Sequence, residues 1–334
     1  MSAPIRLGTR RSALAQAQSG HVATALEKVS GRKVELVPIV SEGDTNRASL
    51  SEIGGLGIFA TRLREALLAG ECDILVHSLK DLPTAVPEGL LIAATPVRED
   101  ARDVVITRDG VGLHELRAGA KVGTGSPRRI AQVHRRAPGA AVIDIRGNVG
   151  SRLGRVESGE LDAVILAAAG LSRLGDDLPD FAMETEYLGL AEWPTAPGQG
   201  ALAVETTVDA PAELLSALAE LDDADTRFAI SVERGILEGL DAGCQAPMAA
   251  HAVVTGDSVR IRTIVYAPEG ERRIGLDVTE YLNGGYIRGN GSGNGADTAD
   301  GADPNHAARE IGLSVARRLL EQGAAGLISR EQLL

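Results

Sequence analysis

Aromatic residues are scarce in this chain of 334 residues, which has one Trp, four Tyr and three Phe. A general surface for stacking nucleic-acid bases is therefore not expected. The net charge of −12 at pH 7 also argues against a DNA-binding protein. With so few aromatics, the core must be built from Ala, Val, Leu and Ile.

Cysteine is nearly absent as well, with Cys72 and Cys244 alone. Two cysteines are too few for a disulfide framework, and without a Cys/His cluster a zinc site or other metal site is not expected. No stretch approaches the ~20 apolar residues of a membrane span, and the N-terminus lacks the apolar run of a signal peptide. We therefore expect a cytoplasmic protein with no membrane partner. The oligomeric state is left open, and a monomer fits.

Apolar runs of strand length alternate with helical patterns over residues 1–205. The expected strands are 5–9, 34–40, 73–76, 90–94, 104–107, 121–124, 141–145, 163–166 and 201–205. The expected helices are 12–29, 59–69, 127–136 and 148–157. This alternation predicts an α/β fold of βαβ units with largely parallel sheets.

The character of the chain changes after residue 221. Helical patterns at 225–240 and 307–322 flank short alternating strands at 250–254 and 259–265, which predicts a smaller α+β domain. Residues 283–305 are dominated by Gly, Asn, Asp and Ala and have almost nothing to bury. We interpret them as a solvated insertion; a calcium site is the alternative.

The charge of the chain reverses locally within residues 121–155. Eight basic side chains lie there against one acid, Asp144. The eight are Lys121, Arg128, Arg129, Arg135, Arg136, Arg146, Arg152 and Arg155. A solvated helix end explains Arg135 and Arg136, because cations suit a helix C-terminus. The others favour an anion site, since guanidinium groups bind carboxylate or phosphate bidentately.

Three segments place polar residues at turns from a strand into a helix. In residues 123–129 glycines allow close approach of the backbone, Ser126 can cap the helix, and Arg128 and Arg129 follow at once. Residues 9–12 and 146–148 repeat the pattern. Helix N-termini favour anions, so three of them predict a ligand with several negative groups. The segment 123–129 lacks the Gly-Lys-Ser/Thr ending of a P-loop.

Two further segments could carry chemistry. Residues 77–81, His-Ser-Leu-Lys-Asp, follow a buried strand, and Asp81 could either cap a turn or stabilise a cation that forms during a reaction. His77 is more simply structural. Cys244 lies in a loop after a helix, where it could be a reachable nucleophile or a buried, inert thiol.

Together these segments resemble the porphobilinogen deaminase family. The matching stretches, in the order of the family, are 8–12, 76–81, 123–129, 146–148 with Arg152, 169–173, 197–200 and 238–247. The resemblance implies two doubly wound domains like the lobes of periplasmic binding proteins, with a cleft between them, and a smaller α+β domain that carries the cysteine. The implied domains are 1–98 with 200–220, 99–199, and 221–334.

The resemblance also implies a function. Members of this family condense four porphobilinogen molecules head to tail onto a covalent dipyrromethane cofactor and release ammonia. By this resemblance Cys244 holds the cofactor, Asp81 is catalytic, and the carboxylates of the pyrroles are bound by a larger set. The implied cofactor-binding residues are Ser78, Lys80, Thr124, Ser126, Arg128, Arg129 and Arg146. The implied substrate-binding residues are Arg10, Ser12, Arg152, Arg173 and Gln199.

The chain departs from the pattern of the family at two places. Glu52 and Leu56 stand where many relatives have lysines in a Gly-rich lid, and Gly125 stands where relatives often have a second hydroxyl residue. The rival interpretation is a two-lobed anion receptor or effector-binding module, which would explain the basic residues and leave Cys244 unexplained.

Overall fold

The computed structural model describes residues 3–39, 58–175, 178, 184–243, 246–282 and 304–328. The chain divides into two compact units. The first contains Met1–Arg98, Ala201–Phe228 and Gly284–Pro304, and the second contains Glu99–Gly200, Ala229–Asn283 and Asn305–Leu334. The predicted division into three domains stays a prediction, because the second unit joins residues 229–283 to 99–200.

The sheet of the first unit has the order β2-β1-β3-β10-β4. Its strands are β1 (Ile5–Thr9), β2 (Val34–Pro38), β3 (Ile74–Ser78), β4 (Leu90–Ala94) and β10 (Leu202–Thr207). β1 pairs in parallel with β2 and β3, whereas β10 is antiparallel to both β3 and β4. The expectation of largely parallel sheets is therefore wrong for half of the strand pairs in this sheet.

Helices α1 (Ala13–Ser30), α3 (Ile58–Leu68) and α7 (Ala212–Ala219) belong to this first unit. Successive residues of β3 enter different hydrophobic clusters. Ile74 packs with Leu26 of α1, whereas Leu75 packs with Leu63 of α3. Since neighbouring side chains of a strand point to opposite faces, both faces of the sheet are covered, as a doubly wound fold requires.

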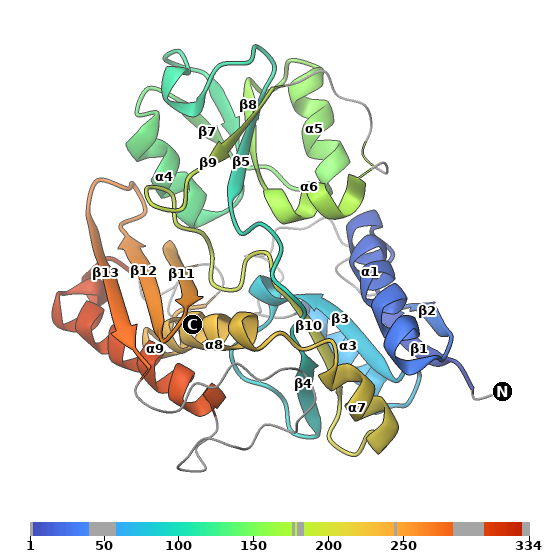
Figure 1. Ribbon diagram of the computed structural model, residues 1–334. Helices are drawn as coiled ribbons and strands as arrows, with labels where there is room; N and C mark the ends of the chain where they lie inside the picture. The colour runs from blue at the N-terminus through green and yellow to red at the C-terminus, as the bar shows by residue number, and fades with distance from the viewer. Residues whose placement is uncertain are drawn as a thin grey trace. The chain divides into compact units, whose positions relative to one another are not determined.

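The sheet of the second unit repeats this arrangement in the order β7-β6-β8-β5-β9. Its strands are β5 (Asp103–Thr107), β6 (Lys121–Gly123), β7 (Ala141–Ile143), β8 (Ala163–Ala167) and β9 (Glu184–Leu188). β6 is parallel to β7 and β8, and β5 is antiparallel to β8 and β9. Its helices are α4 (Pro127–Arg136), α5 (Val149–Glu157) and α6 (Ala168–Leu174), and Figure 1 shows β8, β5 and β9 side by side.

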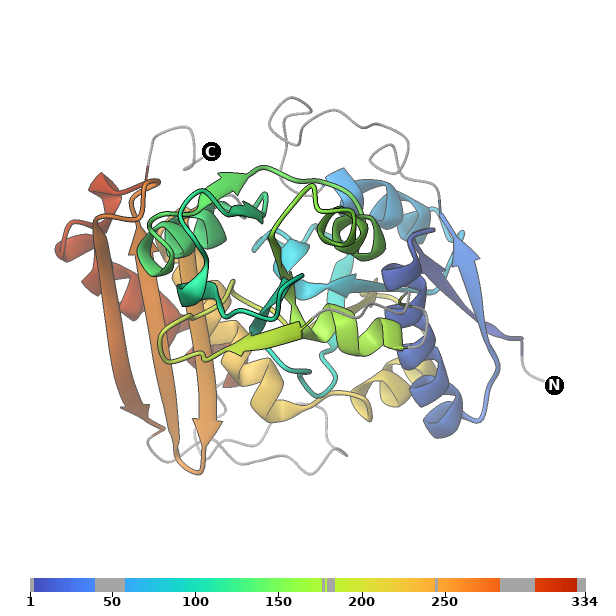
Figure 2. The ribbon, with the colours of Figure 1, turned by 90° about the horizontal axis from the view of Figure 1, so that it is seen from above.

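A third sheet contains β11 (Met248–Thr255), β12 (Ser258–Tyr266) and β13 (Arg273–Tyr281), all antiparallel (Figure 2). Helices α8 (Ala224–Gly239) and α9 (Pro304–Glu321) meet through glycines, because a Cβ on Gly312 would lie 2.3 Å from the carbonyl oxygen of Val232. The α/β class with a smaller α+β part is confirmed. Within the described residues, no helix has both the length and the apolar character to cross a membrane.

Candidate anion-binding site

In the first unit, two segments with predicted site residues follow parallel neighbouring strands. Residues 10–12 follow β1 and residues 79–81 follow β3, so both leave the carboxyl edge of one sheet. Ser12 is the N-cap of α1, and its hydroxyl accepts a hydrogen bond from the amide of Ala15 at 3.3 Å. From the same helix, the side-chain amide of Gln18 donates to the hydroxyl of Ser78 at 3.3 Å. This contact ties the two segments together.

Asp81 ends a short 3₁₀ helix, Leu79–Asp81, whose anchor is the buried side chain of Leu79. The carboxylate of Asp81 is exposed, and Lys80 beside it is half-buried. Asp81 is therefore held by backbone that packs into the core, while its charge faces outward. That arrangement suits a group that acts on a bound molecule.

A buried ion cluster supports the strand that leads to Asp81. Arg64 of α3 donates to Glu205 of β10 through Nε at 2.9 Å and Nη2 at 2.8 Å, and Nε2 of His77 lies 3.3 Å from the same carboxylate. Burial opposes the charge of Glu205, but its contacts with His77 and Arg64 outweigh the effect of burial and hold the pKa of Glu205 below its usual value. His77 thus has a buried structural partner.

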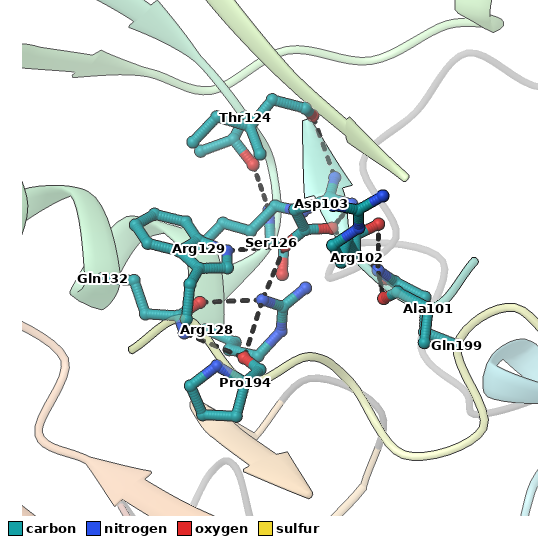
Figure 3. A network of polar contacts seen from close by, with 12 residues as sticks. Ala101, Arg102, Asp103, Thr124, Ser126, Arg128, Arg129, Gln132, Pro194 and Gln199 are labelled. Atoms are coloured by element: carbon teal, nitrogen blue, oxygen red, sulfur yellow. Dashed lines mark hydrogen bonds and ion pairs between the residues drawn. The ribbon is translucent and has the colours of Figure 1, made fainter. Parts of the chain in front are cut away.

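In the second unit, residues 124–126 follow β6 and lead into α4. The amide of Thr124 donates to the carbonyl of Ile143 at 3.0 Å. The hydroxyl of Thr124 accepts a hydrogen bond from the amide of Ser126 at 3.3 Å (Figure 3). Ser126 is the N-cap of α4, yet its own hydroxyl makes no capping hydrogen bond. Within the described residues, the hydroxyl of Ser126 is therefore left available to an anion at this helix start.

Arg146 lies at the neighbouring turn, between β7 and α5. Asn148 caps α5 by accepting a hydrogen bond from the amide of Ser151 at 2.8 Å, and Nε of Arg152 donates to the carbonyl of Gly147 at 2.9 Å. Arg146 is exposed, and no residue in the described part of the chain gives its guanidinium an ion pair. It is the predicted anion-binding arginine whose charge is most available.

Arg128 and Arg129 have a partner that the sequence did not suggest. Asp103 of β5 accepts from Nη1 of Arg128 at 2.8 Å and from Nη2 of Arg129 at 2.6 Å (Figure 3). The same carboxylate accepts from Trp193 Nε1 and from Gln199 Nε2, each at 2.8 Å. The two arginines are only 2% and 6% exposed. Both guanidinium groups therefore share a buried carboxylate partner from another strand, and their contact with the cofactor stays a prediction.

Two guanidinium groups and one carboxylate leave one positive charge in this buried cluster. Burial opposes the charge of Asp103, but Arg128 and Arg129 outweigh it and hold its pKa well below the usual range; burial lowers the pKa of Arg128. Nε of both arginines is buried without a hydrogen-bond partner in the described structure. Since buried donors are nearly always satisfied, these two donors stand out at the start of α4.

Arg173 and Gln199 are also buried, and their contacts are mainly to backbone. Nη2 of Arg173 donates to the carbonyl of Gly200 at 2.6 Å, and Nε2 of Gln199 also donates to the carbonyl of Ala101 at 2.8 Å. Burial lowers the pKa of Arg173, which Glu99 partly opposes. Both side chains hold the loop before β10 in place, and their contact with substrate stays a prediction.

Several predicted features lie outside the described residues. They are Cys244, the Gly-rich segment with Glu52 and Leu56, and the insertion from 283 to 303. The other cysteine, Cys72, is buried in a hydrophobic cluster with Leu63 and Leu75.

Comparison with known proteins identifies the family. "Porphobilinogen deaminase, dipyromethane cofactor binding domain" matches residues 5–213, and "Porphobilinogen deaminase, C-terminal domain" matches residues 228–321. The chain belongs to the porphobilinogen deaminase family. It is 49% identical to porphobilinogen deaminase 1 of Streptomyces coelicolor over 97% of both chains, and 46% identical to that of Leifsonia xyli subsp. xyli over 97% of this chain and 94% of the relative.

A periplasmic binding protein of Salmonella typhimurium is also similar, with 16% identity, a TM-score of 0.38, and coverage of 65% of this chain and 92% of the other. Membership of the porphobilinogen deaminase family makes the chain an enzyme of the transferase kind with a dipyrromethane cofactor. The predicted family, enzyme class and cofactor are thereby confirmed. The anion-receptor alternative is not supported.

Sequence reasoning missed Asp103, although a signal for it exists. Asp103 directly precedes the apolar run 104–107 in a strand that is buried at every position. A carboxylate in such a strand needs a buried partner, because charged residues are almost never fully buried alone. That rule would have pointed to the arginines of α4.

Proposed function

We propose that this chain condenses four porphobilinogen molecules head to tail onto its cofactor, releases ammonia at each step, and frees hydroxymethylbilane by hydrolysis. We place it in the cytoplasm as a monomer. Each pyrrole of the substrate carries an acetate and a propionate. The observation that carries the proposal is the start of α4, where the unpaired Nε atoms of Arg128 and Arg129 accompany the uncapped hydroxyl of Ser126.

In this proposal, one set of residues binds the carboxylates of the cofactor and a second set binds those of the substrate. Those that hold the cofactor are Ser78, Lys80, Thr124, Ser126, Arg128, Arg129 and Arg146, with Cys244 as the covalent attachment. Those that hold the substrate are Arg10, Ser12, Arg152, Arg173 and Gln199. The buried members act as a preorganised charge, which costs no reorganisation when the ligand enters. The exposed Arg146 supplies a bidentate contact.

Asp81 is the catalytic group of this proposal. When bound, the dipyrromethane supplies the pyrrole carbon to which the first substrate is joined. Departure of ammonia leaves a positive charge on the substrate ring, and the carboxylate of Asp81 stabilises that charge and accepts a hydrogen bond from the pyrrole N–H. Its exposed position on a core-anchored 3₁₀ helix supports this role.

The test is turnover of porphobilinogen by the wild type, Asp81→Asn and Asp81→Ala. Loss of one aimed electrostatic group lowers kcat by ~10²–10³-fold, while intact mass still shows the cofactor. Asp209→Asn is the matched control, because Asp209 is an exposed carboxylate of the same unit and should leave turnover unchanged. Wild type that releases no ammonia refutes the function, whereas near-normal turnover by both Asp81 variants refutes only the role of Asp81.

Attachment of the cofactor has its own test. The protein purified from cells should be heavier than its sequence by two pyrrole units, and Cys244→Ser should lose that increment. A wild-type mass equal to that of the bare chain would remove Cys244 from the site.

A further inference from the structure

The carboxylate of Asp144 lies against the backbone at Gly125, in the space that a side chain at position 125 would enter. A Cβ placed on Gly125 would lie 2.7 Å from Oδ1 of Asp144 and 3.0 Å from the carbonyl oxygen of Ile145. A side chain at this position would displace the carboxylate of Asp144 and would lie tightly against the carbonyl of Ile145. Gly125 stands where relatives often have a hydroxyl residue. The absence of a side chain there leaves room for the carboxylate of Asp144.

This carboxylate lies among the groups that we assign to anion binding. The hydrogen bond from the amide of Thr124 to the carbonyl of Ile143 continues the pairing of β6 and β7 beyond Gly123. Residues 124–126 therefore run beside residues 143–145. Asp144 lies next to Gly125, the residue between Thr124 and Ser126. Arg146 follows two residues later.

The charge of Asp144 has no partner of its own. Its side chain is exposed, and no residue in the described ranges forms an ion pair or hydrogen bond with it. By contrast, Asp103 of the same unit is fully buried and bound by two arginines. A carboxylate beside a site for carboxylates repels them, so Asp144 would weaken binding unless the ligand also brings a positive charge.

Porphobilinogen brings one such charge, the ammonium of its aminomethyl group. Resting on the proposed function, we propose that Asp144 is a further substrate-binding residue that receives this ammonium. Asp144 then sets the orientation of the substrate, because its negative charge attracts the ammonium end and repels the acetate and propionate. A ligand with carboxylates alone would gain nothing from this position.

The position also suits the departure of the amine. Ammonia leaves as a neutral molecule only if the amine is protonated, and a neighbouring carboxylate favours that protonated form. The C–N bond breaks with its electron pair going to nitrogen, and the pyrrole nitrogen donates its lone pair to the ring. The free α-carbon of the other pyrrole then attacks the methylene carbon and forms the new C–C bond. The proton that this α-carbon loses is taken up by the ammonia, which is released as ammonium.

The experiment compares two substrates in the complete enzyme. One is porphobilinogen, and the other is its hydroxymethyl analogue, in which a hydroxyl replaces the amino group and no positive charge is present. Asp144→Asn should lower kcat/KM for porphobilinogen by ~10-fold or more, the size of a lost hydrogen bond to a charged group. For the hydroxymethyl analogue it should stay within about twofold of the wild type.

Asp144→Glu should recover part of the preference for porphobilinogen, and Gly125→Ser should reduce the preference by displacing the carboxylate. Glu157→Gln is the control, since Glu157 is an exposed carboxylate of α5 in the same unit. Equal loss on both substrates, or no loss on either, overturns the proposal. Failure of the wild type to turn over porphobilinogen would instead overturn the proposed function.

Discussion

Asp103 and Arg128 face each other in the interior, with Oδ2 and Nη1 2.8 Å apart, and Arg129 takes the other oxygen of the same carboxylate. One negative charge therefore fixes two adjacent residues of the first turn of α4. Because a buried charge is tolerated only when paired, the carboxylate allows the second guanidinium to stay inside. The positive charge that remains is built into the fold before any ligand binds.

Replacing Asp103 with Asn should destabilise the protein strongly. The substitution keeps the shape of the side chain but leaves two buried guanidinium groups without a counter-charge, and breaking a buried pair costs ~3–5 kcal/mol. Urea unfolding followed by circular dichroism measures the change in the free energy of unfolding.

Asp100→Asn is the matched control for this prediction. Asp100 pairs with Arg102 at 2.6 Å, but their side chains are 26% and 41% exposed. Water and salt screen such a pair, so the loss should stay below ~1 kcal/mol. Equal losses in the two variants would show that Asp103 is no more than an ordinary surface partner.

Much of the fold follows from local signals in the sequence. The apolar runs and cap residues predict β1, β4 and α4 with the observed bounds. β9 has no such signal, because Glu184–Leu188 is largely polar and becomes a strand by pairing with β5. β13 does alternate polar and apolar residues, which is a strand signal that the prediction did not use.

Strand direction and long-range pairing lie beyond such signals. The chain returns to the first sheet as β10 only after residues 99–200, which belong to the second unit. The antiparallel direction of β10 depends on the path of that long segment and not on the residues of β10 itself. The partners of the site are similarly distant. Asp103 precedes Arg128 by 25 residues, and Gly125 meets Asp144 across two strands. Spacing along the chain reveals neither contact.

Arg146→Ala should lower kcat/KM for porphobilinogen more than a change at the end of α4 does, because Arg146 is proposed to hold the cofactor to which the substrate is joined. Arg146 is exposed at the start of α5, and a lost hydrogen bond to a charged group is worth ~1.5–3 kcal/mol, about 10–100-fold in kcat/KM. Arg136→Ala is the control from the same basic segment, since Arg136 pairs with Glu192 on the surface. Steady-state kinetics with porphobilinogen give kcat/KM for both variants. Equal values would show that Arg146 is an ordinary solvated surface residue.

The count of free thiols should be one less than the number of cysteines. The chain has two cysteines, of which Cys72 is buried and Cys244 is proposed to hold the cofactor through a thioether. A colorimetric thiol reagent should find almost none in the native enzyme and one per chain after denaturation. Cys72→Ala should then reduce the denatured count to zero. Two thiols in the denatured wild type would exclude a thioether.

Cys72 should also make the protein less stable in alkali. Burial, aided by the charge of Asp73, raises the pKa of Cys72 to about 11 from the model-compound value of 9.0. Between these values the unfolded chain loses the thiol proton while the native chain keeps it, so the native state binds more protons. The free energy of unfolding must then fall as pH rises from about 9 to about 11.

In Cys72→Ala this part of the decline should be absent, whatever the cost of the smaller side chain at neutral pH. Urea unfolding of both proteins at pH 8, 9.5 and 11 gives the two slopes, and parallel slopes would show that the thiol ionises as readily in the folded chain as in the unfolded one.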